Sequence, residues 1–176
     1  MILNNKHWKW LFGVCLGIFA GTAFCMKWIE PGFRVNDELF TILGLEIFYS
    51  QERVSTILSG VDSSVRTLLQ YHLVFDFAFM AGVYPGIAAL CMLARSKVQN
   101  VSAKKVLLLF ALLQVVALAC DVTENIFLLN WISNPREICC FQIYHFIVIT
   151  KWILALGGTA AGIFLLLISK KVSIAV

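Results

Sequence analysis

The chain has 176 residues, of which 60% are hydrophobic and only 14% are charged. A soluble domain carries about 25% charged residues, so the composition excludes an ordinary soluble protein and predicts one membrane-embedded domain over residues 1–176. The formal net charge is +4, and the basic residues are placed as membrane topology requires, so we expect no nucleic-acid partner.

Four apolar segments are long enough to cross a bilayer, which takes about 20 residues of helix. They cover residues 8–28, 69–93, 106–131 and 141–168. The sequence therefore predicts an all-α polytopic membrane protein, built as a four-helix transmembrane bundle with the lipid bilayer as its partner.

Basic residues flank these segments at three places. They precede the first span, fill the link between the second and third, and follow the fourth: Lys6, Lys9, Arg95, Lys97, Lys104, Lys105, Lys170 and Lys171. Cytoplasmic loops are enriched in Lys and Arg. We therefore expect both termini in the cytoplasm and the loops 29–68 and 132–140 outside.

The outer loop 29–68 is too long for a simple connection and has helical patterns. Asn36 could cap a helix with Leu39, Ile42 and Leu43 along its apolar edge. Asp62 or Ser63 could cap the start of the second span. We expect one or two short helices over the outer mouth of the bundle. The alternative is an amphipathic segment resting on lipid headgroups.

In the first span Gly13, Gly17 and Gly21 repeat every four residues, a spacing that lets two helices approach closely. We expect this stripe to pack against another helix of the same chain. The face of a homo-oligomer is the alternative.

The third span carries the most unusual residues of the chain. Asp121 and Asn125 lie about 40° apart on a helix, and Asp121 and Glu124 about 60° apart, so the three share one face. A charge at the bilayer centre costs roughly 2.5–3.5 kcal/mol on insertion scales. Something must face this polar stripe, and Gln114 extends it by one heptad.

Two other spans carry polar groups at a similar depth. His72 and Asp76 lie one turn apart in the second span, and Tyr144 and Lys151 a heptad apart in the fourth. The predicted topology places them all toward the outside, which predicts an outward-facing polar chamber. The candidate ligand-binding residues are Asp76, Asp121, Glu124, Asn125, Lys151, His72 and Tyr144.

Three carboxylates against one lysine leave an excess of acid that needs protons, a cation or water. This favours binding of a small molecule, a cation or a lipid headgroup. A membrane-embedded enzyme is the alternative, with Asp121 or Glu124 as acid or base and Lys151 holding an anion. A third reading assigns the polar groups to helix packing in a structural or accessory subunit.

We predict no cofactor, while two cofactor hypotheses stay open. A divalent metal could take His72, Asp76, Asp121 and Glu124 as ligands, and a haem could lie between His72 and His145. His145 is about 120° around the helix from Lys151, which argues against the haem.

Six cysteines include a pair that could form a bridge in an oxidising compartment. Cys25 lies at the outer end of the first span, and Cys139 and Cys140 lie in the second outer loop. Cys25 could approach one of these two, but we favour three free thiols over a bridge.

The order of these features resembles a family of small bacterial four-span membrane proteins of unassigned biochemistry. The resemblance rests on Phe33–Glu38 in the outer loop, Asp76 in the second span, Asp-x-x-Glu-Asn at 121–125 and Lys151-Trp152 in the fourth. It covers most of the chain. It implies a four-helix fold in a bacterial inner membrane and implies no reaction.

Overall fold

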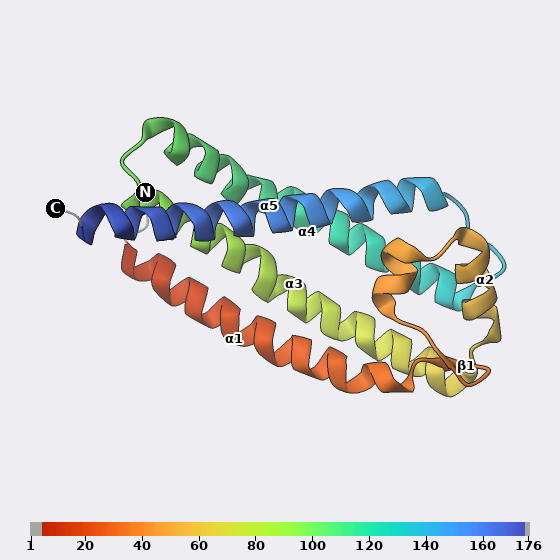
Figure 1. The fold of residues 1–176 in the computed structure, drawn as a ribbon. Coiled ribbons are helices and arrows are strands. Elements are labelled where there is room, and N and C mark those ends of the chain that lie inside the picture. The colour runs from red at the N-terminus through yellow and green to blue at the C-terminus, as the bar shows by residue number, and fades with distance from the viewer. Residues whose placement is uncertain (1–4, 175–176) are drawn as a thin grey trace.

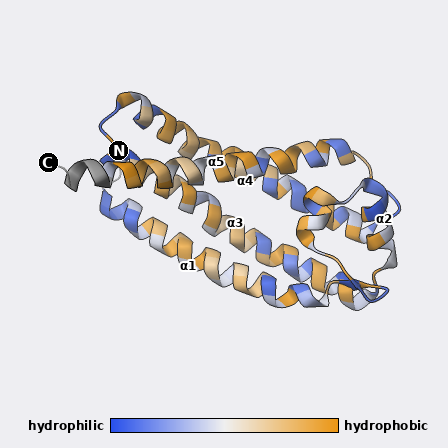
Figure 2. Ribbon diagram, viewed as in Figure 1, coloured by the Kyte–Doolittle hydropathy of each residue, from blue (hydrophilic) through white to orange (hydrophobic). Residues whose placement is uncertain are grey.

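Four long helices make up most of the chain in the computed structural model, which describes residues 5–174 (Figure 1). They are α1 (Asn5–Ile29), α3 (Ser63–Lys97), α4 (Val101–Ser133) and α5 (Phe141–Ile174). All four are long and apolar enough to cross a membrane, and hydrophobic residues predominate along their middle parts (Figure 2). The predicted all-α, multi-pass membrane architecture is confirmed.

The two ends of the bundle differ in what they carry. Residues 30–62 and 134–140 lie at one end, which we call the loop end (Figure 1). The opposite end, called the basic end, holds the start of α1, the α3–α4 link and the end of α5. The loop end contains η1 (Glu30–Gly32), β1 (Arg34–Val35), β2 (Glu38–Leu39), η2 (Gly44–Phe48) and α2 (Gln51–Gly60).

The helix predicted to begin at Asn36 is wrong. Residues 34–39 form a minimal antiparallel hairpin, in which Arg34 pairs with Leu39 and Val35 with Glu38. The two turn residues, Asn36 and Asp37, have φ angles of 50° and 63°. Asn and Asp tolerate this left-handed conformation, and a two-residue hairpin turn requires it. The local turn chemistry therefore overrides the helical pattern.

Two other loop-end expectations hold. Short helical segments are present, namely η2, a single π-helical turn, and α2. Asp62 caps α3, because its Oδ1 accepts a hydrogen bond of 2.8 Å from the Val65 amide.

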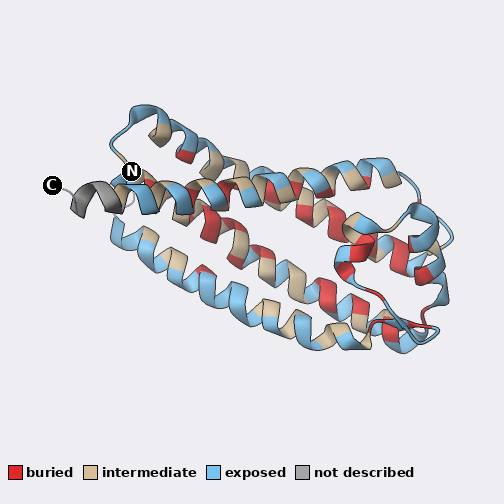
Figure 3. Ribbon diagram, viewed as in Figure 1, coloured by how far each residue is buried: buried red, intermediate tan, exposed pale blue. Residues whose placement is uncertain are grey.

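Residues 30–62 form a cap that belongs to the protein core and does not rest loosely on the surface. Their buried side chains belong to one apolar cluster together with the loop-end parts of α3, α4 and α5. From the cap this cluster contains Phe33, Phe40, Leu45, Val54, Ile57 and Leu58, and from the long helices Leu69, Leu128, Trp131, Tyr144 and Val148. Buried residues accordingly concentrate at the loop end (Figure 3). The cap covers the polar face of the bundle.

Helix α1 packs on α3 through the face opposite to the one we expected. A Cβ atom placed on Gly13, Gly17 or Gly21 would meet nothing within 4 Å. The small residue at the contact is Gly82 of α3, whose Cβ position lies 2.7 Å from the Phe19 amide nitrogen. The predicted intramolecular role of the α1 stripe is therefore wrong. Cys15 and Phe19 on the other side of α1 make the contact.

Candidate functional site

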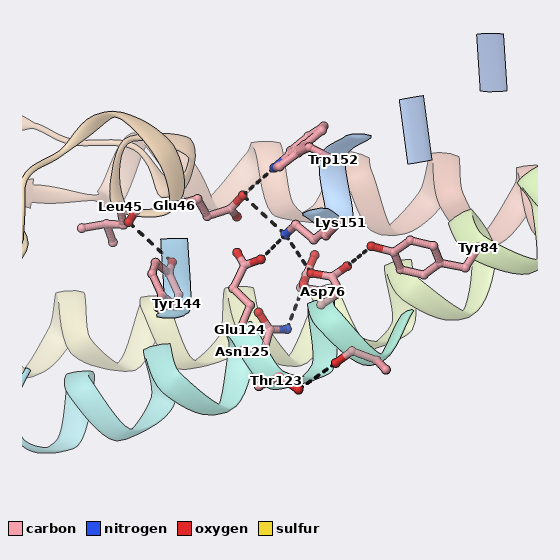
Figure 4. A network of polar contacts seen from close by, with 12 residues as sticks. Leu45, Glu46, Asp76, Tyr84, Thr123, Glu124, Asn125, Tyr144, Lys151 and Trp152 are labelled. Atoms are coloured by element: carbon pink, nitrogen blue, oxygen red, sulfur yellow. Dashed lines mark hydrogen bonds and ion pairs between the residues drawn. The ribbon is translucent and has the colours of Figure 1, made fainter. Parts of the chain in front are cut away.

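Lys151 of α5 is the centre of a buried polar cluster between the long helices and the cap (Figure 4). Its Nζ lies 2.8 Å from Asp121 Oδ1 and 2.6 Å from Glu124 Oε2. Both acids come from the polar face of α4, one turn apart. The lysine is only 7% exposed, Asp121 3% and Glu124 0%. The small residues Gly158 and Gly162 keep α5 close to its neighbours, so Lys151 points inward.

Helix α3 supplies two further members of the cluster. The Tyr84 hydroxyl donates a 2.6 Å hydrogen bond to Asp121 Oδ2, so both oxygens of Asp121 are engaged. Asp76 accepts a 2.8 Å hydrogen bond from Asn125 Nδ2. The structure thus brings Asp76, Asp121, Glu124, Asn125 and Lys151 to one place. Tyr84 was not among the predicted site residues.

The cap contributes a fourth carboxylate, which the sequence did not point to. Glu46, on the π-helical turn η2, lies 3.5 Å from Lys151 Nζ and accepts a hydrogen bond of 3.4 Å from Trp152 Nε1. Glu38, part of the outer-loop motif on which the resemblance rests, pairs with Arg53 at the surface and lies outside this cluster. The one feature of the sequence that could have indicated Glu46 as a site residue is its position as an acid within an apolar stretch. The cluster, called the Lys151 cluster below, consists of Glu46, Asp76, Tyr84, Asp121, Glu124, Asn125, Lys151 and Trp152.

The charges in the Lys151 cluster do not balance. Four carboxyl groups face one ammonium group, and Glu124 Oε1 is buried without a hydrogen-bond partner. An unpaired buried carboxylate is costly, since its desolvation is not offset. The cluster can therefore accept further positive charge and a further hydrogen-bond donor, either as protons or as a cationic ligand.

Burial raises the pKa of the Glu46 carboxyl above its ordinary range; Lys151 opposes this shift and Asp121 adds to it. The folded protein then holds the Glu46 proton more tightly than the unfolded chain does. We expect stability to fall as pH rises from the ordinary glutamate pKa through the raised one. Glu46→Gln should flatten this dependence and stabilise the protein above that window, measured by unfolding across pH.

Glu52, exposed on α2, supplies the matched control. Glu52→Gln makes the same substitution at an exposed position and so controls for the removal of one carboxyl group. An unchanged profile in Glu46→Gln would show that Glu46 does not titrate between the two states.

The remaining predicted residues lie outside the Lys151 cluster. His72 is buried against the Phe33 ring, with ring centroids 5.4 Å apart. His145 stacks on Phe141 at 6.3 Å. Tyr144 is fully buried, and its hydroxyl donates a long 3.5 Å hydrogen bond to the Leu45 carbonyl. The two histidines are therefore held in separate aromatic contacts.

Within residues 5–174 no group of three or more His, Cys, Asp or Glu side chains has the geometry to hold a metal ion. His72, Asp76, Asp121 and Glu124 do not converge as one ligand set there. Cys25, Cys139 and Cys140 are free thiols, which agrees with the outcome that we favoured over a bridge. Gln114 lies two turns before Asp121 on α4, toward the basic end. It donates hydrogen bonds to the Phe110 and Leu154 carbonyls, and the second of these joins α4 to α5.

No protein-family model matches this chain, and no match is found among curated proteins or solved structures.

Proposed function

We propose that this multi-pass membrane protein binds a small organic cation, or a cationic headgroup, at the Lys151 cluster. The observation that carries the proposal is the ratio of four carboxyl groups, two of them buried and two half-buried, to one ammonium group. A ligand ammonium would supply the positive charge and the N–H donors that Glu124 Oε1 lacks.

The surroundings of Lys151 suit a second ammonium group. The Lys151 Nζ lies 5.6 Å from the centre of the Trp152 ring, within reach of a cation–π interaction. The same ring face can attract the ammonium group of a ligand. Among the acids that contact it, Glu46 has the most exposed side chain, at 13% against 4% for Asp121 and 0% for Glu124. Asp76 is also only half-buried. These two carboxylates stand at the edge of the cluster and are the natural first contacts of a ligand.

The membrane-embedded enzyme remains the second candidate, and one observation favours it. Glu124 is fully buried beside Lys151 with one oxygen unpartnered, an environment suited to an acid or base. Thr123, next in the chain, bonds the Ala119 carbonyl on the other face of α4, so its hydroxyl is not placed to react.

Binding can be tested with a water-soluble probe. We expect n-butylammonium to raise the melting temperature of the purified protein, because a ligand that binds only the folded state stabilises it. Butyrate at equal ionic strength should not. Asp76→Asn should reduce the shift. Glu38→Gln, which removes an exposed acid paired with Arg53, should not. Equal shifts with both ions, or none with either, would end the proposal.

The proposed membrane orientation puts the loop end outside and the basic end in the cytoplasm, as the basic residues favour. In a background without native cysteines, Ala103→Cys and Ser55→Cys should react from opposite sides with a membrane-impermeant thiol reagent. Labelling of both from the same side would contradict this orientation.

A further inference from the structure

Two cysteines follow one another in the loop between α4 and α5. Cys139 and Cys140 are both exposed, and α5 begins at the next residue, Phe141. The two thiols interact, because the Cys139 side chain raises the pKa of the Cys140 thiol through a hydrogen bond and through its charge. Solvent therefore reaches two sulfur atoms that already lie side by side.

The backbone on both sides holds this pair in place. Before it, Ile138 is buried, and its carbonyl accepts a 2.9 Å hydrogen bond from Gln51 Nε2 of α2. After it, the Cys140 carbonyl accepts a 3.0 Å hydrogen bond from the Tyr144 amide in α5. Cys140 has a φ angle of 57°, a left-handed conformation that is uncommon outside glycine and that clusters at active sites and ligand clamps. Two thiols fixed in this way lose little freedom when they bind one ligand.

A disulfide within the pair would be strained. Disulfides join Cα atoms that lie about 4.4–6.8 Å apart, whereas consecutive Cα atoms are about 3.8 Å apart across a trans peptide bond. An S–S bond would also draw the two sulfur atoms together to about 2.05 Å. The pair is therefore better suited to holding a third atom between its sulfurs than to bonding to itself.

The number and spacing of the thiols select the kind of atom. A structural zinc ion takes four ligands, but among the side chains that the structure describes no group of three or more His, Cys, Asp or Glu could hold a metal ion. Two-coordinate copper(I) places its sulfur ligands on opposite sides of the metal, farther apart than two sulfur atoms in contact. Trivalent arsenic is thiophilic and pyramidal, so two of its bonds can go to adjacent sulfurs while the third carries its own substituent.

We propose that Cys139 and Cys140 form a dithiol site for monosubstituted trivalent arsenicals. Each thiol replaces one hydroxyl group of an arsonous acid: a sulfur–arsenic bond forms, an arsenic–oxygen bond breaks, and the thiol proton leaves with the hydroxyl group as water. Two water molecules are released and arsenic stays trivalent, so no oxidant or reductant is consumed. The site shares no residue with the Lys151 cluster, so either proposal can fail without the other.

Phenylarsonous acid, the hydrated form of phenylarsine oxide, is the probe. Both cysteines should react with N-ethylmaleimide without prior reduction. One equivalent of the probe should add a single phenylarsenic group, seen by intact mass, and should protect both from the maleimide. Trypsin locates the protection, because residues 137–151 form one peptide that contains no other cysteine. The dithiol dimercaptopropanol should release the adduct, whereas mercaptoethanol at the same thiol concentration should not.

Three of these measurements can overturn the inference. Maleimide labelling that requires prior reduction would mean that the pair is a disulfide. Protection at any peptide other than 137–151 would place the arsenical elsewhere. Equal release by mercaptoethanol would mean that arsenic is held by a single thiol.

Single substitutions test the need for two thiols. Cys139→Ser and Cys140→Ser each leave one thiol of the pair, so each should lose the adduct that resists mercaptoethanol. Both positions are exposed, and serine is close to cysteine in size. Cys25→Ser is the matched control, because it removes one thiol outside the pair and should keep the adduct. A resistant adduct in either serine variant of the pair, or its loss in Cys25→Ser, contradicts the site. If the substituted proteins fail to fold, the peptide map of the unaltered protein decides.

Discussion

Lys151→Met should destabilise the protein by roughly 3–5 kcal/mol, the cost of leaving a buried ion pair without one partner. Lys151 is the single ammonium among four carboxyl groups in the described cluster, and it touches Asp121, Glu124 and Glu46. Methionine keeps much of the side-chain volume, so the loss of stability measures the removal of the positive charge. Unfolding in detergent, followed by helix content, gives the measurement.

Lys27 provides the control, because it also pairs with a glutamate but is 75% exposed. Lys27→Met should cost no more than about 1 kcal/mol, as exposed ion pairs do. If Lys151→Met were as mild as Lys27→Met, the carboxyl groups of the cluster would have to be neutral in the folded protein, and Lys151 would not be their counter-ion.

A double-mutant cycle can assign the partner. Asp121→Asn combined with Lys151→Met should recover part of the single-mutant loss, since Asp121 Oδ1 lies 2.8 Å from Lys151 Nζ. The Asn side chain can still accept the Tyr84 hydrogen bond. Additive losses would reject this pairing and direct attention to Glu124, which lies 2.6 Å from the same nitrogen.

Gly82→Ala should be the second large effect, costing about 1–3 kcal/mol through overpacking. The new Cβ would lie 2.7 Å from the Phe19 amide nitrogen and 2.9 Å from the Cys15 carbonyl oxygen. Both are backbone atoms of α1, so no side-chain rotation can relieve the clash and the helices must separate. Thermal unfolding measures the loss, and protease accessibility of α1 should rise.

Gly17→Ala is the matched control on the neighbouring helix. Nothing lies within 4 Å of its Cβ position, so the change should be neutral or slightly stabilising, because alanine has the higher helix propensity. A large loss in Gly17→Ala, with none in Gly82→Ala, would mean that α1 packs through its glycine stripe after all.

The sequence alone determined the features that depend on local composition and helical period. The length of the apolar runs predicts the four spans, because a helix must cover about 30 Å of hydrocarbon. The 3.6-residue period places Asp121, Glu124 and Asn125 on one face, and their cost in lipid predicts that this face is turned inward. The structure buries all three and brings Lys151 to them.

Other members of the site depended on how the elements pack. Tyr84 reaches Asp121 only because α3 packs against α4, and nothing around Tyr84 in the sequence marks the contact. Glu46 arrives on an irregular π-helical turn, whose position follows from the burial of its apolar neighbours in the core. Contacts of this kind join residues far apart in the chain, so no repeating pattern in the sequence predicts them.

The same distinction explains the two wrong expectations. Asn36 can cap a helix or turn a hairpin, and the pairing of residues 34–39 selects the hairpin. A stripe of glycines shows that a helix could approach a neighbour closely, but which face meets the neighbour depends on both surfaces. Here α3 presents its own glycine, Gly82, to Cys15 and Phe19, and the stripe on α1 faces away. Local sequence limits each helix to a few good packing faces, and the fit between two helices selects one of them.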